Sequence, residues 1–156
     1  MTRSLSTAAR RSAYAPQTSE AWLLLLTITH ESLVAPLRFV NDKVTITSNS
    51  QSFMGFPFAV ELPQESNDAP GEARITIDNV DRSIVTAVRA MATPPEVTIQ
   101  IIMASQPNTI EVEYGAMTLR DVKWDVASVS GTLRHEDIST EPVTVQMTPQ
   151  RFPAMF

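Results

Sequence analysis

The apolar residues of this chain come in short runs, separated by polar or proline-containing stretches. Residues 73–78 alternate strictly, with Ile75 and Ile77 on one side and polar residues on the other, which is the pattern of a half-buried strand. Residues 22–29 form a short apolar run with the length expected of a strand that is buried on both faces. This patterning predicts a fold built mainly from strands.

Further extended segments follow the same pattern, at residues 37–40, 43–47, 56–62, 97–103, 110–114, 117–126 and 129–135. The pair Asn41-Asp42 tolerates turn conformations, so residues 37–40 and 43–47 are predicted to form a hairpin. Pro57 places its segment at a sheet edge or at the start of a strand. Loops or breaks are predicted at residues 63–71, 106–108, Gly115 and 127–128.

One internal helix is predicted after Asp81, which can cap it, and Pro94-Pro95 ends it. Its apolar face consists of Ile84, Val85, Val88 and Met91. Since a single helix is available for a crossover, antiparallel connections should dominate. The predicted fold class is mainly β (α+β): an antiparallel β-sandwich or partly open barrel with one internal helix and extended terminal arms.

The 156 residues fit one domain, with residues 20–147 as its β-rich body. Residues 1–19 form a basic N-terminal arm. Apolar residues at helical spacing in this arm indicate a short helix, which would be marginal in isolation, so the arm should gain order by docking.

Residues 148–156 form an apolar C-terminal anchoring tail that carries Phe152 and Phe156. Ordering such a tail costs roughly 1–2 kcal/mol per residue, whereas burying one large apolar side chain returns about 1.5–3 kcal/mol. The aromatic side chains therefore need a surface to pack on, which is either the chain's own core or a neighbouring subunit.

The charge distribution is polarised. The net charge is −5, which gives no general attraction to nucleic acid or to an anionic membrane, yet the first 19 residues carry arginines and no acid. Such a surface suits a contact with another protein. The predicted interface residues are Arg3, Arg10, Arg11, Arg151, Phe152 and Phe156.

The residues typical of catalysis do not form a recognisable constellation. The chain has no cysteine, and its four glycines are too dispersed for a phosphate-binding loop. His30 and His135 stand at the ends of the first and last predicted strands, and we expect surface residues there, because His135 and Glu136 point to opposite faces of a strand. We therefore predict no catalytic residues, no metal site and no cofactor, and a chain that is not an enzyme.

The apolar run at residues 21–28 is shorter than the roughly 20 residues that span a bilayer, and no signal peptide is predicted. We expect synthesis in the host cytoplasm and no membrane partner.

Several strings taken in order carry a family resemblance: residues 20–30 (EAWLLLLTITH), 37–42 (LRFVND), 56–63 (FPFAVELP), 73–82 (ARITIDNVDR) and 148–156 (TPQRFPAMF). The chain resembles a family of phage and prophage proteins encoded among the tail genes, which look like counterparts of the tail tip L proteins of lambda-like siphophages. The L-type proteins carry a cysteine-rich iron–sulfur region, whereas this chain has no cysteine to bind such a cluster.

The resemblance implies a structural subunit of a phage tail tip or baseplate, located in the virion. It would form a homo-oligomeric ring, with a trimer favoured over a hexamer, that joins the tail tube or distal tail ring to the central hub or fibre protein; the tape measure protein is a further candidate partner. A sixfold distal tail protein and a tail assembly factor are the alternatives in the same class. A carbohydrate-binding module at the host surface and a cell-wall hydrolase are less favoured.

Overall fold

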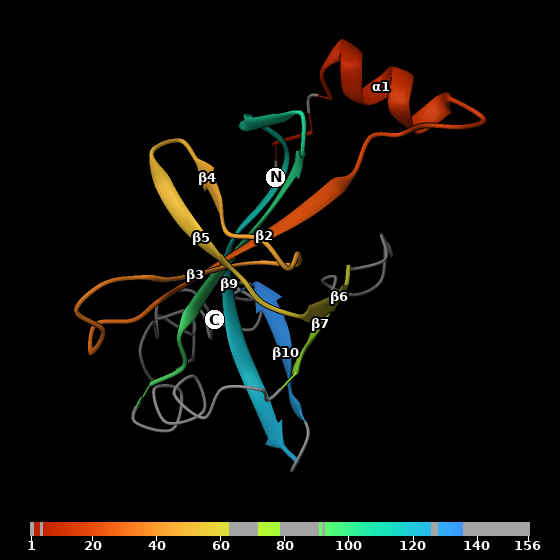
Figure 1. The fold of residues 1–156 in the computed structure, drawn as a ribbon. Coiled ribbons are helices and arrows are strands. Elements are labelled where there is room, and N and C mark those ends of the chain that lie inside the picture. The colour runs from red at the N-terminus through yellow and green to blue at the C-terminus, as the bar shows by residue number, and fades with distance from the viewer. Residues whose placement is uncertain are drawn as a thin grey trace, which may run out of the picture.

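The computed structural model describes residues 2–3, 5–62, 72–78, 91, 93–125 and 128–135. Its strands form one sheet in the order β4-β5-β3-β2-β8-β9-β10-β7-β6, and β1 pairs with β9 outside this path (Figure 1). The elements are β1 (Thr2–Arg3), α1 (Thr7–Tyr14), β2 (Trp22–Thr29), β3 (Leu37–Val40), β4 (Ile46–Ser48), β5 (Gln51–Gly55), β6 (Phe58–Glu61), β7 (Ala73–Asp78), β8 (Glu96–Met103), β9 (Gln106–Trp124) and β10 (Ser128–His135). Every neighbouring pair of strands is antiparallel except β3 and β5.

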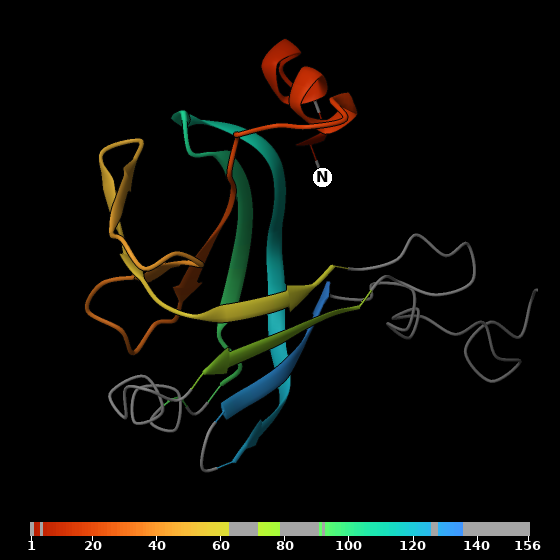
Figure 2. The ribbon, with the colours of Figure 1, turned by 45° about the vertical axis from the view of Figure 1, so that its right-hand side comes forward.

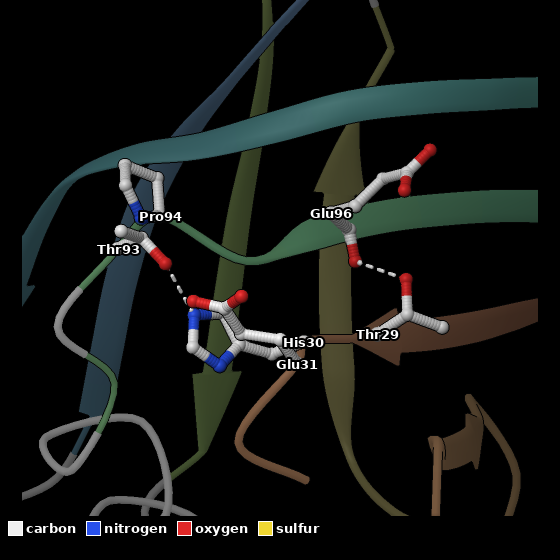
Figure 3. A pocket seen from close by; sticks show the side chains of 6 residues that line it. All are labelled: Thr29, His30, Glu31, Thr93, Pro94 and Glu96. Atoms are coloured by element: carbon white, nitrogen blue, oxygen red, sulfur yellow. Dashed lines mark hydrogen bonds between the residues drawn. The ribbon is translucent and has the colours of Figure 1, made fainter.

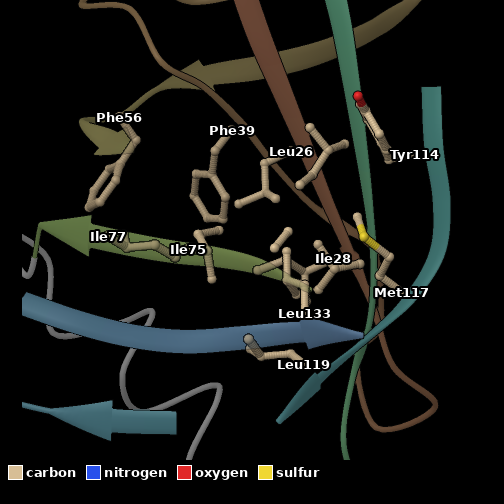
Figure 4. Packing of buried hydrophobic residues seen from close by; sticks show 13 residues of the cluster. Leu26, Ile28, Phe39, Phe56, Ile75, Ile77, Tyr114, Met117, Leu119 and Leu133 are labelled. Atoms are coloured by element: carbon tan, nitrogen blue, oxygen red, sulfur yellow. The ribbon is translucent and has the colours of Figure 1, made fainter. Parts of the chain in front are cut away.

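The sheet bends into two layers, as expected of a β-sandwich or partly open barrel. Figure 2 shows β6, β7 and β10 crossing the direction of β8 and of the first part of β9. Side chains from β2, β3 and β8 meet those from β7 and β10 in the main core (Figure 4). The buried members of this core are Leu26, Ile28, Phe39, Phe56, Ala73, Ile75, Ile77, Val97, Ile99, Tyr114, Met117, Leu119 and Leu133. The mainly β, antiparallel fold class predicted from the sequence is confirmed.

Strand β2 is buried on both faces, as its continuous apolar run predicted. Leu26 and Ile28 lie in the main core, whereas Leu23 and Leu25 point to the opposite face. A second core covers that face and consists of Leu23, Leu25, Val40, Phe53 and Ile102. The β4–β5 hairpin supplies Phe53, so β2 lies between two packed layers.

The predicted hairpin between residues 37–40 and 43–47 is wrong. Asn41 extends the pairing of β3 with β2: its backbone N–H donates to the Leu24 carbonyl (3.1 Å), and its Oδ1 accepts the Leu24 N–H (2.7 Å). The turn lies instead at Asn49 and Ser50, which both have positive φ (47° and 65°) and join β4 to β5. Two successive positive φ angles are the geometry of tight hairpin turns.

The predicted separation of residues 110–114 from 117–126 at Gly115 is also wrong, because residues 110–114, Gly115 and residues 117–124 all belong to the 19-residue strand β9 (Gln106–Trp124). The predicted break at residues 106–108 is displaced as well, since Gln106 already pairs with Met103. Bulges bend β9 instead of interrupting it: its register shifts against β8 and again against β10. These bends let β9 pair with β8 along its first part and with β10 along its second.

Other predicted elements agree with the structure or lie outside it. The predicted strand at residues 73–78 is β7, with strict alternation of buried and exposed residues. Pro57 immediately precedes β6, which is the last strand of the sheet order, as predicted for this proline. The predicted loop at residues 63–71 lies outside the described residues, as do residues 82–90 of the helix predicted after Asp81; Met91, the last residue of its predicted apolar face, is described and is not helical.

The bulge residue Ala116 gives a testable stability prediction. It is exposed and has φ of 52°, a left-handed conformation that costs a non-glycine residue about 1–2 kcal/mol. Glycine relieves this cost but loses more entropy on folding, about 0.5–1 kcal/mol. We expect Ala116→Gly to raise the free energy of unfolding by roughly 0.5–1 kcal/mol in chemical denaturation.

Ala59 supplies the matched control, because it is also an exposed strand alanine but is absent from the residues with positive φ. Ala59→Gly should lower the free energy of unfolding by about 0.5–1 kcal/mol. Equal losses in the two variants would contradict the strain at Ala116.

Candidate interface at the N-terminal arm

The N-terminal arm contains a capped helix, in agreement with the short helix predicted from its apolar spacing. Ser6 is the N-cap of α1: its Oγ accepts the Ala9 N–H (3.0 Å), and its carbonyl accepts the Arg10 N–H (3.0 Å). Ala9 is completely buried, whereas Tyr14 at the end of the helix is 87% exposed. Figures 1 and 2 both place α1 beside the end of the sheet where β9 begins.

A buried glutamate of β9 holds the start of this helix. Glu111 is 1% exposed; its Oε2 accepts the Ser6 N–H and its Oε1 accepts the Ser6 hydroxyl, each at 2.7 Å. A buried carboxylate is costly unless hydrogen bonds replace the lost water, and Ser6 supplies a bond to each oxygen. Thr2 and Arg3, which precede Ser6 in the chain, pair with Glu113 and Val112 of β9.

A bulge explains why Glu111 points inward. Ile101 pairs with Val112, whereas the next residue, Ile102, pairs with Ile110. Glu111 is therefore an extra residue in β9, and bulges are known to redirect side chains in this way. As a result Ile110 packs against the second core and Val112 against the main core. Without the bulge, residues two apart in a strand would point to the same face.

The linker after α1 folds back on the helix. The Trp22 indole N–H donates to Ser12 Oγ (3.3 Å), and Ser12 Oγ lies 3.2 Å from Thr18 Oγ1. Residues 16–19 are exposed. The described contacts between the arm and its own body are thus polar contacts at Ser6 and Ser12, two strand pairs and one buried alanine.

Of the predicted basic interface residues, the structure describes the side chains of Arg10 and Arg11. Arg10 and Arg11 are exposed on α1, and Arg10 Nε donates to the Leu5 carbonyl (3.1 Å). The backbone of Arg3 lies in β1, while its side chain is outside the described part. The predicted C-terminal interface residues Arg151, Phe152 and Phe156 lie outside the described residues. Ser6 and Glu111 were not predicted, because the alternation in residues 110–114 places Glu111 on the same face as Glu113.

The pocket at the end of β2 contains His30, Glu31, Thr29, Thr93, Pro94 and Glu96 (Figure 3). His30 Nδ1 accepts the Ser32 N–H (3.1 Å), so in the neutral ring Nε2 carries the proton and donates to Thr93 Oγ1 (2.7 Å). Both ring nitrogens of His30 thereby fasten the loop after β2 to the segment before β8. His135, at the end of β10, is separated from His30 by β8 and β9 in the sheet order. Among the described residues, no group of three or more His, Cys, Asp or Glu is placed to hold a metal ion.

A family model for a domain of unknown function, DUF1833, matches residues 8–148. The chain belongs to this family. The DUF1833 match begins within α1 and runs through all the strands from β2 to β10. No curated protein matches the chain in sequence.

A solved structure shares this fold. A chain from the virion of a native gene transfer agent particle superposes with a TM-score of 0.60 and 11% sequence identity. The superposition covers 91% of the DUF1833 chain and 49% of the virion chain, so the DUF1833 chain spans about half the length of that protein. In the part of the DUF1833 chain that the structure describes, no helix is long and apolar enough to cross a membrane.

Proposed function

We propose that this protein is a structural subunit of a phage-type virion, located at the tail tip or baseplate. In this proposal it forms a ring that joins the tail tube or distal ring to the central hub or fibre, and it has no catalytic activity or cofactor. The observation that carries the proposal is the superposition on a virion chain over 91% of the residues at a TM-score of 0.60. The resemblance to phage tail-gene products adds the position within the particle.

The arm supports a role in assembly. It carries Arg10 and Arg11 exposed on a helix beside the body of the domain, in a chain whose net charge is −5. Electrostatic complementarity of this kind favours correct docking and faster encounter with an acidic neighbour. The large exposed side chain of Tyr14 lies on the same helix, and tyrosine is enriched at protein interfaces.

The proposal is tested by locating the chain in the particle that its source produces. Particles are purified with an epitope-tagged chain, labelled with gold-conjugated antibody and compared with particles from a strain that lacks the gene. We expect label at the tail end and loss of complete tails in the deletion strain. Complete, infectious particles without the chain would overturn the structural role.

The same experiment separates the alternatives. A chain required for tails but missing from finished particles is an assembly factor. Native mass spectrometry of the isolated ring distinguishes a trimer from the hexamer that a distal tail protein would form.

Charge reversal on the arm gives a direct prediction. Arg10→Glu with Arg11→Glu should reduce incorporation into tails about tenfold or more, because like charges facing an acidic neighbour are repulsive. The isolated fold should remain, since both side chains are exposed. The measurement is the ratio of variant to wild-type chain in purified particles by quantitative mass spectrometry.

The matched control reverses Arg120 and Lys123 to glutamate, which makes the same charge change at exposed positions near the other end of β9. Its incorporation should stay near the wild-type level. Equal loss in both double variants would show that net charge, not the arm, governs incorporation.

A further inference from the structure

Among the described residues, the first part of β9 has few strand-pairing partners on the side beside the arm. Between residues 106 and 116, one side of β9 pairs with β8. On its other side, the structure describes pairing at Val112 and Glu113 alone, with the two residues of β1. The start of β9 is also held by the β4–β5 hairpin, where Ser48 Oγ donates to the Pro107 carbonyl (2.6 Å) and the Asn49 N–H donates to Asn108 Oδ1 (2.8 Å). The part of the strand beside the arm, with so few described partners, is a template for pairing with another chain.

The described residues of the arm make few contacts with this edge. β1 contributes two residue pairs, Ser6 bonds to Glu111, and Ala9 is the buried apolar residue of α1. Burying an alanine stabilises far less than burying a large side chain. Release of the arm therefore costs little compared with unfolding the body.

The contacts at this edge nevertheless restrict which chain segment can bind there. With the arm gone, the buried Glu111 would lose the Ser6 N–H and hydroxyl that bind its two oxygens at 2.7 Å. A replacement strand must bring a donor pair at the same place, followed by a residue as small as Ala9. The identical arm of a second copy meets both conditions by construction.

The linker permits the exchange. Residues 15–21 join α1 to β2, and residues 16–19 are exposed. Seven extended residues span roughly 23 Å, so the arm can reach away from its own body while remaining tethered. Exchange of identical elements between copies is a route to oligomers that needs few new contacts.

We propose that the arm of residues 2–14 exchanges between copies, so that β1 and Ser6 of one subunit bind β9 and Glu111 of the next. This inference builds on the ring of the proposed function and names the contact that closes it. The occupant of the β9 edge is thus a second copy of this chain. Tyr14, exposed in the isolated subunit, then lies at the junction between two bodies.

Single cysteines test the exchange, because the natural chain has none. Thr2 pairs directly with Glu113, and Cα atoms of paired antiparallel residues lie about 4.5–5.5 Å apart, within reach of a disulfide. Purified full-length Thr2→Cys and Glu113→Cys chains are mixed, unfolded and refolded together at high concentration, and then oxidised. Neither variant can form an internal disulfide, so mixed dimer on non-reducing gels in excess of random cross-linking reports an arm bound in trans.

The control mixes Ser19→Cys, on the exposed linker, with Glu113→Cys. We expect at least fivefold more mixed dimer from the Thr2 pair than from this control. Mixed dimer at or below the control level overturns the exchange, whether or not a chain carrying both Thr2→Cys and Glu113→Cys forms its internal disulfide. The test uses the purified protein alone, so its outcome is independent of where the chain lies in a particle.

Discussion

Gly55→Ala is expected to lower the free energy of unfolding by about 3 kcal/mol, at the upper end of the cost of overpacking. A Cβ at this position would lie 2.8 Å from the Asp42 carbonyl oxygen and 2.8 and 2.9 Å from the Lys43 carbonyl carbon and oxygen. These are backbone atoms, so they cannot move aside as the end of a flexible side chain can. Gly55 pairs with Val40, and the backbone of residues 42–43 lies directly against it, so we expect the substitution to force the β4–β5 layer away from the second core.

The measurement is thermal or urea unfolding of the purified variant, in which 3 kcal/mol corresponds to a fall of roughly 6–12 °C in Tm. Gly115→Ala is the matched control: its Cβ would find Glu113 Oε1 at 3.7 Å as its nearest neighbour, an ordinary contact, and Gly115 has no positive φ. It should be neutral or stabilise by up to about 1 kcal/mol through a less flexible unfolded chain. Equal stability of the two variants would show that the backbone around Gly55 can move apart to accept a Cβ.

The sequence predicted those strands whose environment follows from local pattern. Ile75 and Ile77 alternate with polar residues, and β7 shows the same alternation of buried and exposed positions. The run at residues 22–29 gave β2 with its correct bounds, because a strand covered on both faces needs apolar residues at successive positions.

Predictions failed where contacts with distant residues decide the conformation. Asparagine is common in turns, but the side chain and backbone of Asn41 bind Leu24 instead. The conformation of Asn41 is therefore determined by its contact with the neighbouring strand β2. Glycine often interrupts a strand, yet β9 continues through Gly115 because bulges let the strand change direction without losing its pairing with β8. The turn at Asn49 could have been predicted from the sequence, since asparagine tolerates positive φ better than most residues.

The sequence indicates the basic residues of the arm but not the residue that anchors the arm to the body. Arg10 and Arg11 stand out in the sequence because no acid precedes Glu20, and the structure leaves both exposed on α1. Glu111 has no such signal: it and Glu113 are indistinguishable in an alternating segment. A one-residue shift in the pairing of β8 with β9 makes Glu111 the buried anchor of the arm. The register between these two strands cannot be read from a single sequence.

Glu111→Ala is expected to release the arm while leaving the body folded. The variant removes both acceptors of Ser6, and hydrogen bonds to a charged group contribute about 1.5–3 kcal/mol each, partly offset here by the desolvation that burial of Glu111 costs. A net loss of about 2 kcal/mol shifts the opening equilibrium of the arm roughly 30-fold. Trypsin cleaves after exposed arginines, so cleavage at Arg10 and Arg11 in dilute protein should accelerate by about the same factor, because proteolysis follows the population of the open state.

Glu113→Ala is the control, since it removes a glutamate two residues along β9 whose Oε2 accepts from Gln100 Nε2 (2.7 Å) of the neighbouring strand β8. Its arm should be cleaved at nearly the wild-type rate. Glu111→Gln should fall between the two variants, because an amide can still accept the Ser6 N–H but bonds as a neutral group. Wild-type cleavage in Glu111→Ala would mean that β1 pairing and Ala9 burial hold the arm alone, and Glu111 would then be a buried acid without a role in positioning it.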